Sequence, residues 1–400
     1  MHKPKPNRQF LFYSILIVIL TTLFVGLILP RLSSPRAKPE YTIGLAEGTV
    51  RAEVIEILEE GEITLGETTQ TYRILHVKVL EGEWRGLAFD IDYGQRQIRP
   101  PGLLPGIGDE VLITIGQDQN NVLTAYFTDF VRTRPVLILL ATFAVFSILI
   151  SGWKGVRGLI GMAISLAVIL YYILPNILEG RDPVWVSITG AFGLLAVTLY
   201  LVYGWTLKTH SAVLGTLIAL ILTGLLANFF VNLTRLTGFG SEDALFLIQA
   251  QNVQINLRGL VLGGMLIGAL GVLDDLVITQ ASVVFEIHHT DPGLKFRWLF
   301  QRAMRVGQDH VAATVNTLVL AYAGAALPTL LLFSISGTAF SHLLNLEFVT
   351  EEVVRTLVGS LGLFASVPIT TALACWVVLK YHEWGEWAKW LGPEGGGHAH

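Results

Sequence analysis

A stripe of polar side chains inside an apolar segment is the feature of this sequence most able to do chemistry. Between Leu257 and His289, small and polar residues recur every three or four positions, so a continuous helix places them on one face. Its acidic and hydroxylic members are Asp275, Thr279, Ser282 and Glu286, and Asp274 precedes the first of them. An acid at membrane depth costs about 3 kcal/mol, so it usually faces a bundle interior or a cavity. These residues therefore predict an ion or substrate pathway in which Asp275 and Glu286 carry protons or cations.

The depth of the two aspartates leaves two interpretations open. A span of about 20 residues that starts at Arg258 ends near Val277, which places Asp274 and Asp275 close to the inner interface. One interpretation is an interfacial helix end followed by an amphipathic segment on the membrane surface. The other is a long or broken helix whose acids line an inward-facing cavity.

The next apolar segment adds two polar candidates to this pathway. Asp309 lies where that helix begins, and Asn316 lies further along the same segment. Helix capping would also explain Asp309. An amide inside a membrane helix needs a partner, so Asn316 either bonds to another helix or contacts a ligand.

Glycines on two segments predict places of close helix packing. Gly264-x-x-x-Gly268, followed by Gly271, would let another helix approach the stripe closely. Gly359 and Gly362 occupy a comparable small-residue surface in the last apolar segment.

The sequence carries no signature of a catalytic or metal site. His288, His289 and Asp309 match no zinc-binding helix spacing, and neither a P-loop nor a G-x-S-x-G element occurs. A single cysteine, Cys375, excludes an internal disulfide and an all-cysteine metal site. The net charge of −4 does not suit a nucleic-acid partner. We expect no enzymatic activity, no cofactor and no metal.

The elements that position these residues are membrane spans. The chain has 400 residues, of which 52% are hydrophobic and only 14% charged, whereas soluble domains average roughly 25% charged residues. Eight apolar segments are long enough to cross a bilayer. They lie at 10–29, 135–152, 158–175, 183–203, 211–231, 258–277, 311–333 and 354–379. We interpret the first as an uncleaved signal anchor, because the apolar part of a signal peptide is shorter.

Lysine and arginine in the short loops predict the orientation of these spans. The segments on one side, such as those with Lys154, Lys208 and Lys380, carry many more basic residues than the short loops on the other. By the positive-inside rule the basic side is cytoplasmic. Both termini are then cytoplasmic, in a bacterial inner membrane.

Residues 31–133 form a region of different character. They carry 16 acidic and 10 basic residues, which is the density of a soluble domain. Leu75, Val77 and Val79 alternate with polar residues, as do Val111 and Ile113, which is typical of β-strands with one buried face. We predict a small extracytoplasmic all-β domain, first as an OB-like Greek-key barrel and otherwise as a sandwich.

Several motifs resemble those of the YibE/F-like family of bacterial multi-pass membrane proteins. The resemblance extends over about residues 45–378 and rests on the order and spacing of short motifs. They include Gly152-Trp153-Lys154-Gly155, Lys208-Thr209, Val306-Gly307-x-Asp309, Asn316 to Tyr322 and Glu352 to Gly362. The chain differs from that pattern at Asp274, where the family usually has an apolar residue, and at Gln308, where it has arginine. The resemblance implies the same membrane layout but no particular activity, and it makes Asp274 the weaker candidate of the acidic pair.

The sequence therefore predicts an all-α polytopic membrane protein of about eight spans with an inserted β domain. Its parts are an anchor at 1–30, the β domain at 31–133, a seven-helix domain at 134–380 and a cytoplasmic tail at 381–400. The leading functional hypothesis is a permease or secondary transporter of an unknown small solute or ion, coupled to protons or cations. The alternative is a non-transporting scaffold or sensor whose β domain binds a partner. The lipid bilayer is the one partner that the sequence requires, and a homo-oligomer is left open.

Overall fold

A computed structural model describes residues 48–100, 102–117, 122–250, 255–336, 340–384 and 390–394. The chain divides into two compact units. The first contains an antiparallel sheet and the beginning of the helix that follows it, up to Phe146, and the second contains the helices from Ser147 onward. We describe each unit by itself. The predicted anchor at 10–29 lies outside the described residues.

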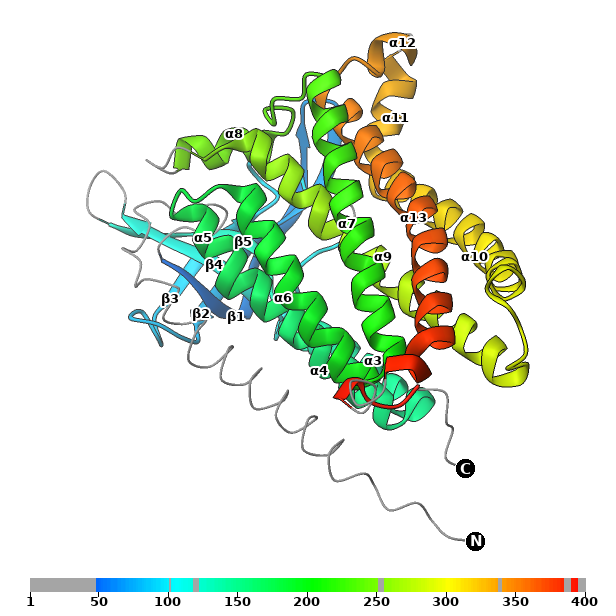
Figure 1. Cartoon of the computed structure of the whole chain (residues 1–400). Helices are drawn as coiled ribbons and strands as arrows, with labels where there is room; N and C mark the ends of the chain where they lie inside the picture. The colour runs from blue at the N-terminus through cyan, green and yellow to red at the C-terminus, as the bar shows by residue number, and fades with distance from the viewer. Residues whose placement is uncertain are drawn as a thin grey trace, which may run out of the picture. The chain divides into compact units, whose positions relative to one another are not determined.

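The sheet contains five antiparallel strands in the order β3-β2-β1-β4-β5 (Figure 1). The strands are β1 (Thr49–Leu65), β2 (Thr68–Val79), β3 (Ala88–Tyr93), β4 (Glu110–Gln117) and β5 (Leu123–Phe130). Strand β1 pairs with β2 along most of its length and with β4 near its start. The hairpins β1–β2 and β4–β5 therefore belong to one sheet, with β1 at its centre.

The alternation predicted from the sequence sets the face of the sheet that is buried. Leu75, Val77, Val111 and Ile113 are fully buried, and their cluster includes Tyr93. The rings of Tyr93 and Phe127 meet edge to face with centroids 4.8 Å apart. The sheet thus packs its apolar side chains against one another on one face.

The structure confirms a small antiparallel sheet in the predicted all-β region, and the described strand ladders do not close it into a barrel. The five strands form a single sheet, and it is not closed, because no ladder joins edge strands β3 and β5 within the described residues. Two register shifts in β1, after Val54 and after Ile57, interrupt its pairing with β2. Such bulges bend and twist a strand. Pairing between the edges depends on contacts far apart in sequence, which the alternation of residues does not report.

The helices account for the predicted apolar segments. The long ones are α3 (Thr133–Ser151), α4 (Trp153–Val168), α6 (Pro183–Tyr203), α7 (Leu207–Leu233), α9 (Leu257–Thr290), α10 (Phe296–Ala325) and α13 (Glu347–Lys380). Shorter ones are η2 (Ile169–Ile173), α5 (Leu174–Leu178), α8 (Glu242–Ala250), α11 (Leu327–Ser336), α12 (Phe340–Leu343) and η3 (Tyr381–Trp384). Within the described residues, six helices are long and apolar enough to cross a membrane, counting 153–178 as one. Helices α10 and α11, bent by 62°, make a seventh if the pair forms one span.

Two of these elements differ from the predicted spans. Helix α9 continues well past the predicted end at residue 277, because Ala281, Val284 and Phe285 keep one side of it buried. The span predicted at 311–333 begins earlier, at Phe296, and bends between α10 and α11.

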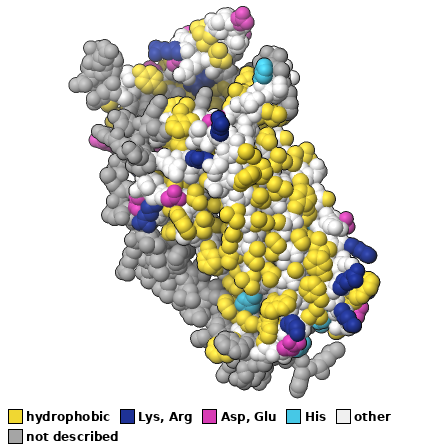
Figure 2. All heavy atoms as spheres, turned by 45° about the horizontal axis from the view of Figure 1, so that its top comes forward, with side chains coloured by type: hydrophobic (Ala, Val, Ile, Leu, Met, Phe, Trp, Pro, Cys, Tyr) yellow, Lys and Arg dark blue, Asp and Glu magenta, His cyan; other side chains and the backbone are white. Residues whose placement is uncertain are grey.

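Helix α7 runs antiparallel to two of its neighbours in the bundle, α9 and α13. Gly224 and Gly215 of α7 lie against Leu266 and Val277 of α9, so these two helices are antiparallel. Helix α7 is also antiparallel to α13, since Gly215 lies against Thr370 and Thr223 against Gly362. Figure 2 shows one face with a broad expanse of hydrophobic side chains and charged side chains at its margins. Such a surface suits contact with lipid.

Candidate functional site

The predicted polar stripe lies on one face of a single unbroken helix. Asn256 caps α9 by accepting a hydrogen bond from the amide of Gly259 at 3.0 Å. Asp275 and Glu286 are exposed on the helix, and Thr279 and Ser282 are half-buried. The two hydroxyls donate to carbonyl oxygens one turn earlier in α9, at 2.8 Å each. They can therefore accept hydrogen bonds or bind a cation, but their protons are already used.

Asp274 lies in a more enclosed place than Asp275. It is half-buried, and its Oδ1 has no hydrogen-bond partner among the described residues. Both acids line a cavity of about 300 Å³ between α4, α6 and α9. The other lining residues are Gly158, Gly161, Met162, Ser165, Thr198, Leu199, Val202, Tyr203, Gly271 and Ile278. A buried carboxylate oxygen without a partner is costly, so this cavity is the place where water or a ligand would meet the acid.

Small residues of α4 leave the space in front of the acids. Gly158, Gly161 and Ser165 follow one another at steps of three and four, which places them on one face of α4. A Cβ atom at Gly161 would lie at ordinary contact distances from the side chains of Thr198 and Val202 in α6. None of these wall residues was predicted from the sequence, although the spacing of the small residues in α4 is a signal of a shared face.

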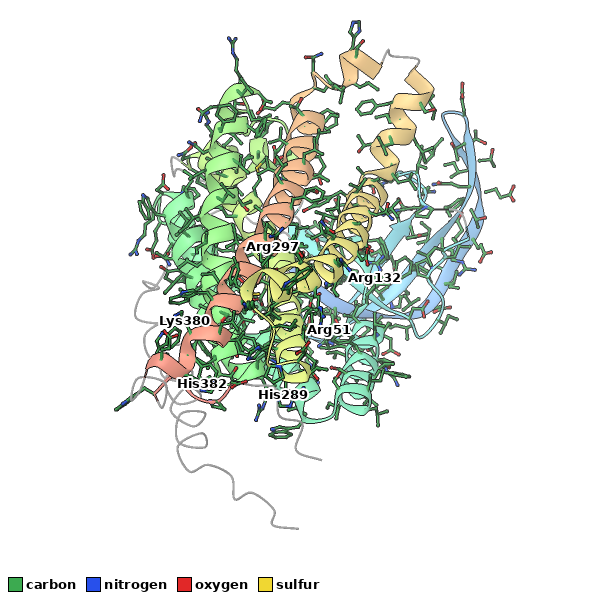
Figure 3. All side chains as sticks on the ribbon, turned by 45° about the vertical axis from the view of Figure 1, so that its right-hand side comes forward. Arg51, Arg132, His289, Arg297, Lys380 and His382 are labelled. Atoms are coloured by element: carbon green, nitrogen blue, oxygen red, sulfur yellow. The ribbon has the colours of Figure 1, made fainter. Side chains whose placement is uncertain are left out.

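Along the helix axes, the cavity lies well away from the end of the bundle. Gly215 of α7 packs against Val277 of α9, and α7 begins about two turns earlier, at Leu207. Because α7 and α9 are antiparallel, Asp274 lies about three turns, roughly 16 Å, from the level of Leu207. By the same register Glu286 lies near that level, at the end of the bundle. His289, Lys380 and His382 are found at this end of the helical unit (Figure 3).

The two candidates on α10 do not line this cavity. Asp309 and Asn316 are exposed on α10, and neither is among the residues that line the cavity. Helix α10 runs beside α9, as shown by a hydrogen bond from Gln280 to the carbonyl of Ala303 at 3.1 Å. The structure thus places Asp274 and Asp275 at the same cavity as residues of α4 and α6. Asp309 and Asn316 lie outside that cavity, on an exposed face of α10.

Most of the glycines predicted to lie at close helix contacts do not lie at such contacts within the described residues. A side chain at Gly264, Gly271 or Gly359 would meet nothing within 4 Å in the described structure. At Gly268 it would only touch the Tyr322 hydroxyl, at 3.8 Å. Gly362, by contrast, lies tightly against Thr223 of α7. On α9 the close approach belongs to Gly263, whose neighbours are Ser187 and the carbonyl oxygen of Pro183 in α6.

The arrangement of the cavity suits the handling of cations or protons. Two carboxylates on adjacent positions of α9 border a small space within a bundle of apolar helices. Such a pair can bind a cation or hold an exchangeable proton. The hydroxyls of Ser165 and Thr198 supply further oxygen atoms around the space.

Apolar helices of membrane-spanning length, with a small antiparallel sheet preceding them, define a polytopic membrane protein. The family model described as YibE/F-like protein matches residues 139–380. The chain therefore belongs to the YibE/F-like family, which confirms the resemblance noted in its motifs. The match starts inside α3, so the sheet lies outside it. No curated protein matches the chain, and no solved structure matches it either.

Proposed function

We propose that this protein is a permease or secondary transporter, without enzymatic activity, that moves a small solute or ion in exchange with protons or cations. The observation that carries the proposal is the cavity between α4, α6 and α9, in which the Oδ1 of Asp274 is buried without a hydrogen-bond partner in the described part of the chain. Intramembrane acids of this kind mark ion and substrate pathways in membrane proteins. In this proposal Asp274 and Asp275 together bind the coupling ion.

The proposed setting is a bacterial inner membrane with both termini in the cytoplasm. Lys154, Lys208 and Lys380 lie at or near the ends of α4, α7 and α13. The helix directions given above bring the ends with Lys208 and Lys380 to the same side of the bundle. By the positive-inside rule that side faces the cytoplasm, and residues 31–133 are then extracytoplasmic.

Neutralising the acids tests the proposal. We would purify the full chain, reconstitute it into liposomes that contain the pH-sensitive dye pyranine, and add solutes and inorganic cations one at a time. We expect at least one of them to drive proton movement with the native chain. Asp274→Asn and Asp275→Asn should each lower that rate at least tenfold, because an amide cannot carry a proton or a charge.

The matched control is Asp291→Asn, which changes an exposed aspartate just after α9. Asp291 is paired with Arg302 at 3.4 Å, outside the cavity. The Asp291→Asn variant should keep the native rate of proton movement. Equal rates in all three variants would contradict the proposed role of the acidic pair.

A second candidate function is a scaffold or sensor whose sheet unit binds a partner. A groove of about 860 Å³ lies beside edge strands β3 and β5, and Asp90, Asp92, Arg96 and Arg99 are among its lining residues. The strand order, with β1 shared between β2 and β4, supports an OB-like arrangement that remains open at its edges. Unpaired edges and charged walls favour a protein partner.

The two candidates differ in what they tolerate. A strain that lacks this protein would be complemented with the amide variants or with a chain that lacks residues 40–133. A transporter requires the acids, so the amide variants should fail at native membrane levels. A scaffold tolerates the amides and fails when the sheet is removed.

A further inference from the structure

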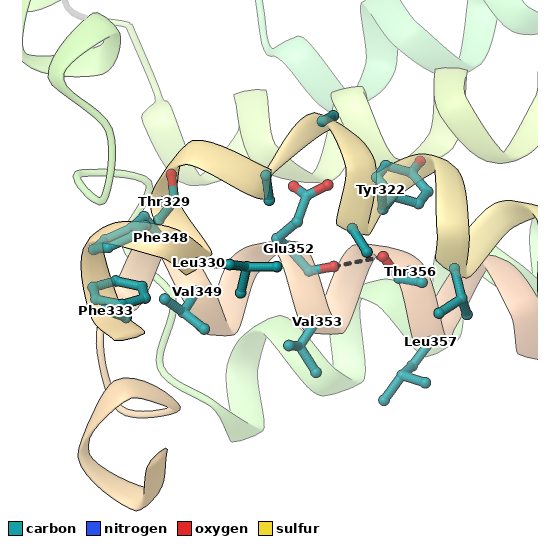
Figure 4. A pocket seen from close by; sticks show the side chains of 14 residues that line it. Tyr322, Thr329, Leu330, Phe333, Phe348, Val349, Glu352, Val353, Thr356 and Leu357 are labelled. Atoms are coloured by element: carbon teal, nitrogen blue, oxygen red, sulfur yellow. Dashed lines mark hydrogen bonds between the residues drawn. The ribbon is translucent and has the colours of Figure 1, made fainter. Parts of the chain in front are cut away.

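A second cavity lies at the bend between α10 and α11, away from the acidic pair. It measures about 560 Å³, within the range of sites for small organic ligands. Its walls come from α10, α11 and α13 (Figure 4). The bend at Ala326 makes the space, because it turns α11 by 62° from the line of α10.

Aromatic and aliphatic side chains make up most of the wall. Phe333 of α11 and Phe348 of α13 stack with ring centroids 5.7 Å apart at one end. Tyr322 lies toward the other end (Figure 4). Leu330, Val353 and Leu357 fill the sides. Such walls favour a ligand with an apolar body, and aromatic faces also attract cations.

One charged residue is found among the described residues that line this cavity. Glu352 extends from α13 toward α10 (Figure 4). Its carboxylate accepts a hydrogen bond from Arg355 at 2.8 Å, and the same guanidinium donates to Glu351 at 2.5 Å. Two carboxylates thus share one guanidinium, and the cluster has a formal charge of −1 when both acids are ionised. All three side chains are at least two-thirds shielded from solvent.

We propose that this cavity binds hydrophobic organic cations, with the apolar body against the aromatic walls and the positive charge beside Glu352. An apolar space alone would accept any lipid chain. The excess negative charge at its edge is what selects a cation over a neutral or anionic molecule of the same shape. This binding does not depend on the transport proposed above, since the acidic pair lies in a different cavity.

Two probes of the same shape and opposite charge test the proposal. The full chain would be placed in phosphatidylcholine nanodiscs, and binding of radiolabelled tetraphenylphosphonium would be measured against empty nanodiscs. The isosteric anion tetraphenylborate would be measured in parallel. We expect saturable binding of the cation, and no binding of the anion beyond its partition into empty nanodiscs.

Three variants connect the binding to this cavity. Glu352→Gln removes the charge and should weaken the affinity for tetraphenylphosphonium at least tenfold. Ala323→Phe fills the cavity, leaves the charged cluster intact and should abolish binding. Glu383→Gln is the matched control, because Glu383 also takes part in an i,i+3 ion pair, with Lys380, but lies outside the cavity. It should bind like the native chain.

Several results would overturn the proposal. Equal binding of the cation and the anion would identify the cavity as an apolar space filled by lipid chains. Unchanged affinity in both Glu352→Gln and Ala323→Phe would place the cation elsewhere. Absence of saturable binding in the native chain would exclude a site for this class of ligand.

Discussion

The side chain of Gln280 joins three helices in the interior of the bundle. It belongs to α9 and is almost completely buried. Its amide nitrogen donates to the carbonyl oxygen of Ala303 in α10 and, at 2.7 Å, to the hydroxyl of Thr371 in α13. An amide held in this way fixes the register of all three helices, and it can be replaced only at a cost.

Gln280→Leu should lower the stability of the folded chain by about 1 kcal/mol, because interhelical hydrogen bonds in membranes average about 0.6 kcal/mol each. The measurement is unfolding in mixed micelles of increasing SDS content. Gln301→Leu, at an exposed position of α10, is the control and should change stability little. Equal stability of both variants and the native chain would mean that these two hydrogen bonds do not stabilise the fold.

Adjacent glycines on α9 make a second test at the level of single residues. A methyl group at Gly263 would collide with Ser187 and lie 3.1 Å from the carbonyl oxygen of Pro183, whereas one at Gly264 meets nothing. Gly263→Ala should therefore cost about 1–3 kcal/mol in the same unfolding assay. Gly264→Ala should stay within about 1 kcal/mol of the native chain. The reverse order would show that Gly264 packs against another helix.

The candidate site could be predicted in part from single residues. The helical spacing placed the polar stripe on one face of α9, and the structure has that continuous helix. The choice between Asp274 and Asp275 depended on α4 and α6, which border the same cavity as α9 from distant parts of the sequence. Spacing within one helix does not report which of two adjacent acids a neighbouring helix encloses. Glu352 was noted as the start of a family motif but not predicted as a site residue, because an acid near the start of a helix is common.

The contact between α7 and α13 lies at positions that are defined only once the helices assemble into a bundle. Gly362 of α13 touches Thr223 of α7, whose β-branched side chain has little freedom to move away. Gly362→Ala should lower stability by about 1–3 kcal/mol. Gly359→Ala, one turn earlier and in open space, is the control. A loss of stability confined to Gly359→Ala would contradict this account of the interface.

The sheet carries its own pH-dependent contact. Arg51 of β1 bonds to Glu81, just after β2, at 2.7 and 2.9 Å. This hydrogen bonding holds the pKa of the Glu81 carboxyl below its ordinary value of 4.5. A group with a lowered pKa stabilises the folded state above the ordinary value, and the contribution is lost as the pH falls through the folded-state pKa. Both side chains are exposed to solvent, so we expect the contribution to stability to be small.

Hydrogen exchange of the β1 amides checks this expectation. Native and Glu81→Gln chains would be compared at the same pH, so that intrinsic exchange rates cancel. The native chain should be slightly better protected at pH 6, and the difference should disappear near pH 3. A difference that grows as the pH falls would contradict the assigned sign.

At the scale of elements, the sequence predicted most of the helices and strands but not their assembly. Seven apolar segments coincide with helices of the structure, because long apolar runs are a strong signal. The extension of α9 beyond residue 277 was one of two interpretations that the sequence left open, and the structure has the long helix. The open edges of the sheet could not be foreseen, because closure depends on pairing between strands distant in sequence.

At the scale of the whole molecule, the proposed transport requires that water reaches the cavity between α4, α6 and α9. The most direct measurement is labelling of single cysteines in a chain that carries Cys375→Ala, using inverted membrane vesicles and a small charged methanethiosulfonate. The positions are Ser165→Cys and Thr198→Cys, which line the cavity and leave both acids in place. Leu195→Cys, buried in α6 and not among the lining residues, is the control.

We expect the two lining positions to be labelled from the cytoplasmic face, and Leu195→Cys to remain unlabelled. That result would mean that an aqueous path leads to Asp274 and Asp275. If the lining positions resist the reagent as fully as the control does, the cavity is closed to water. The central claim, a pathway through the acidic pair, would then be contradicted.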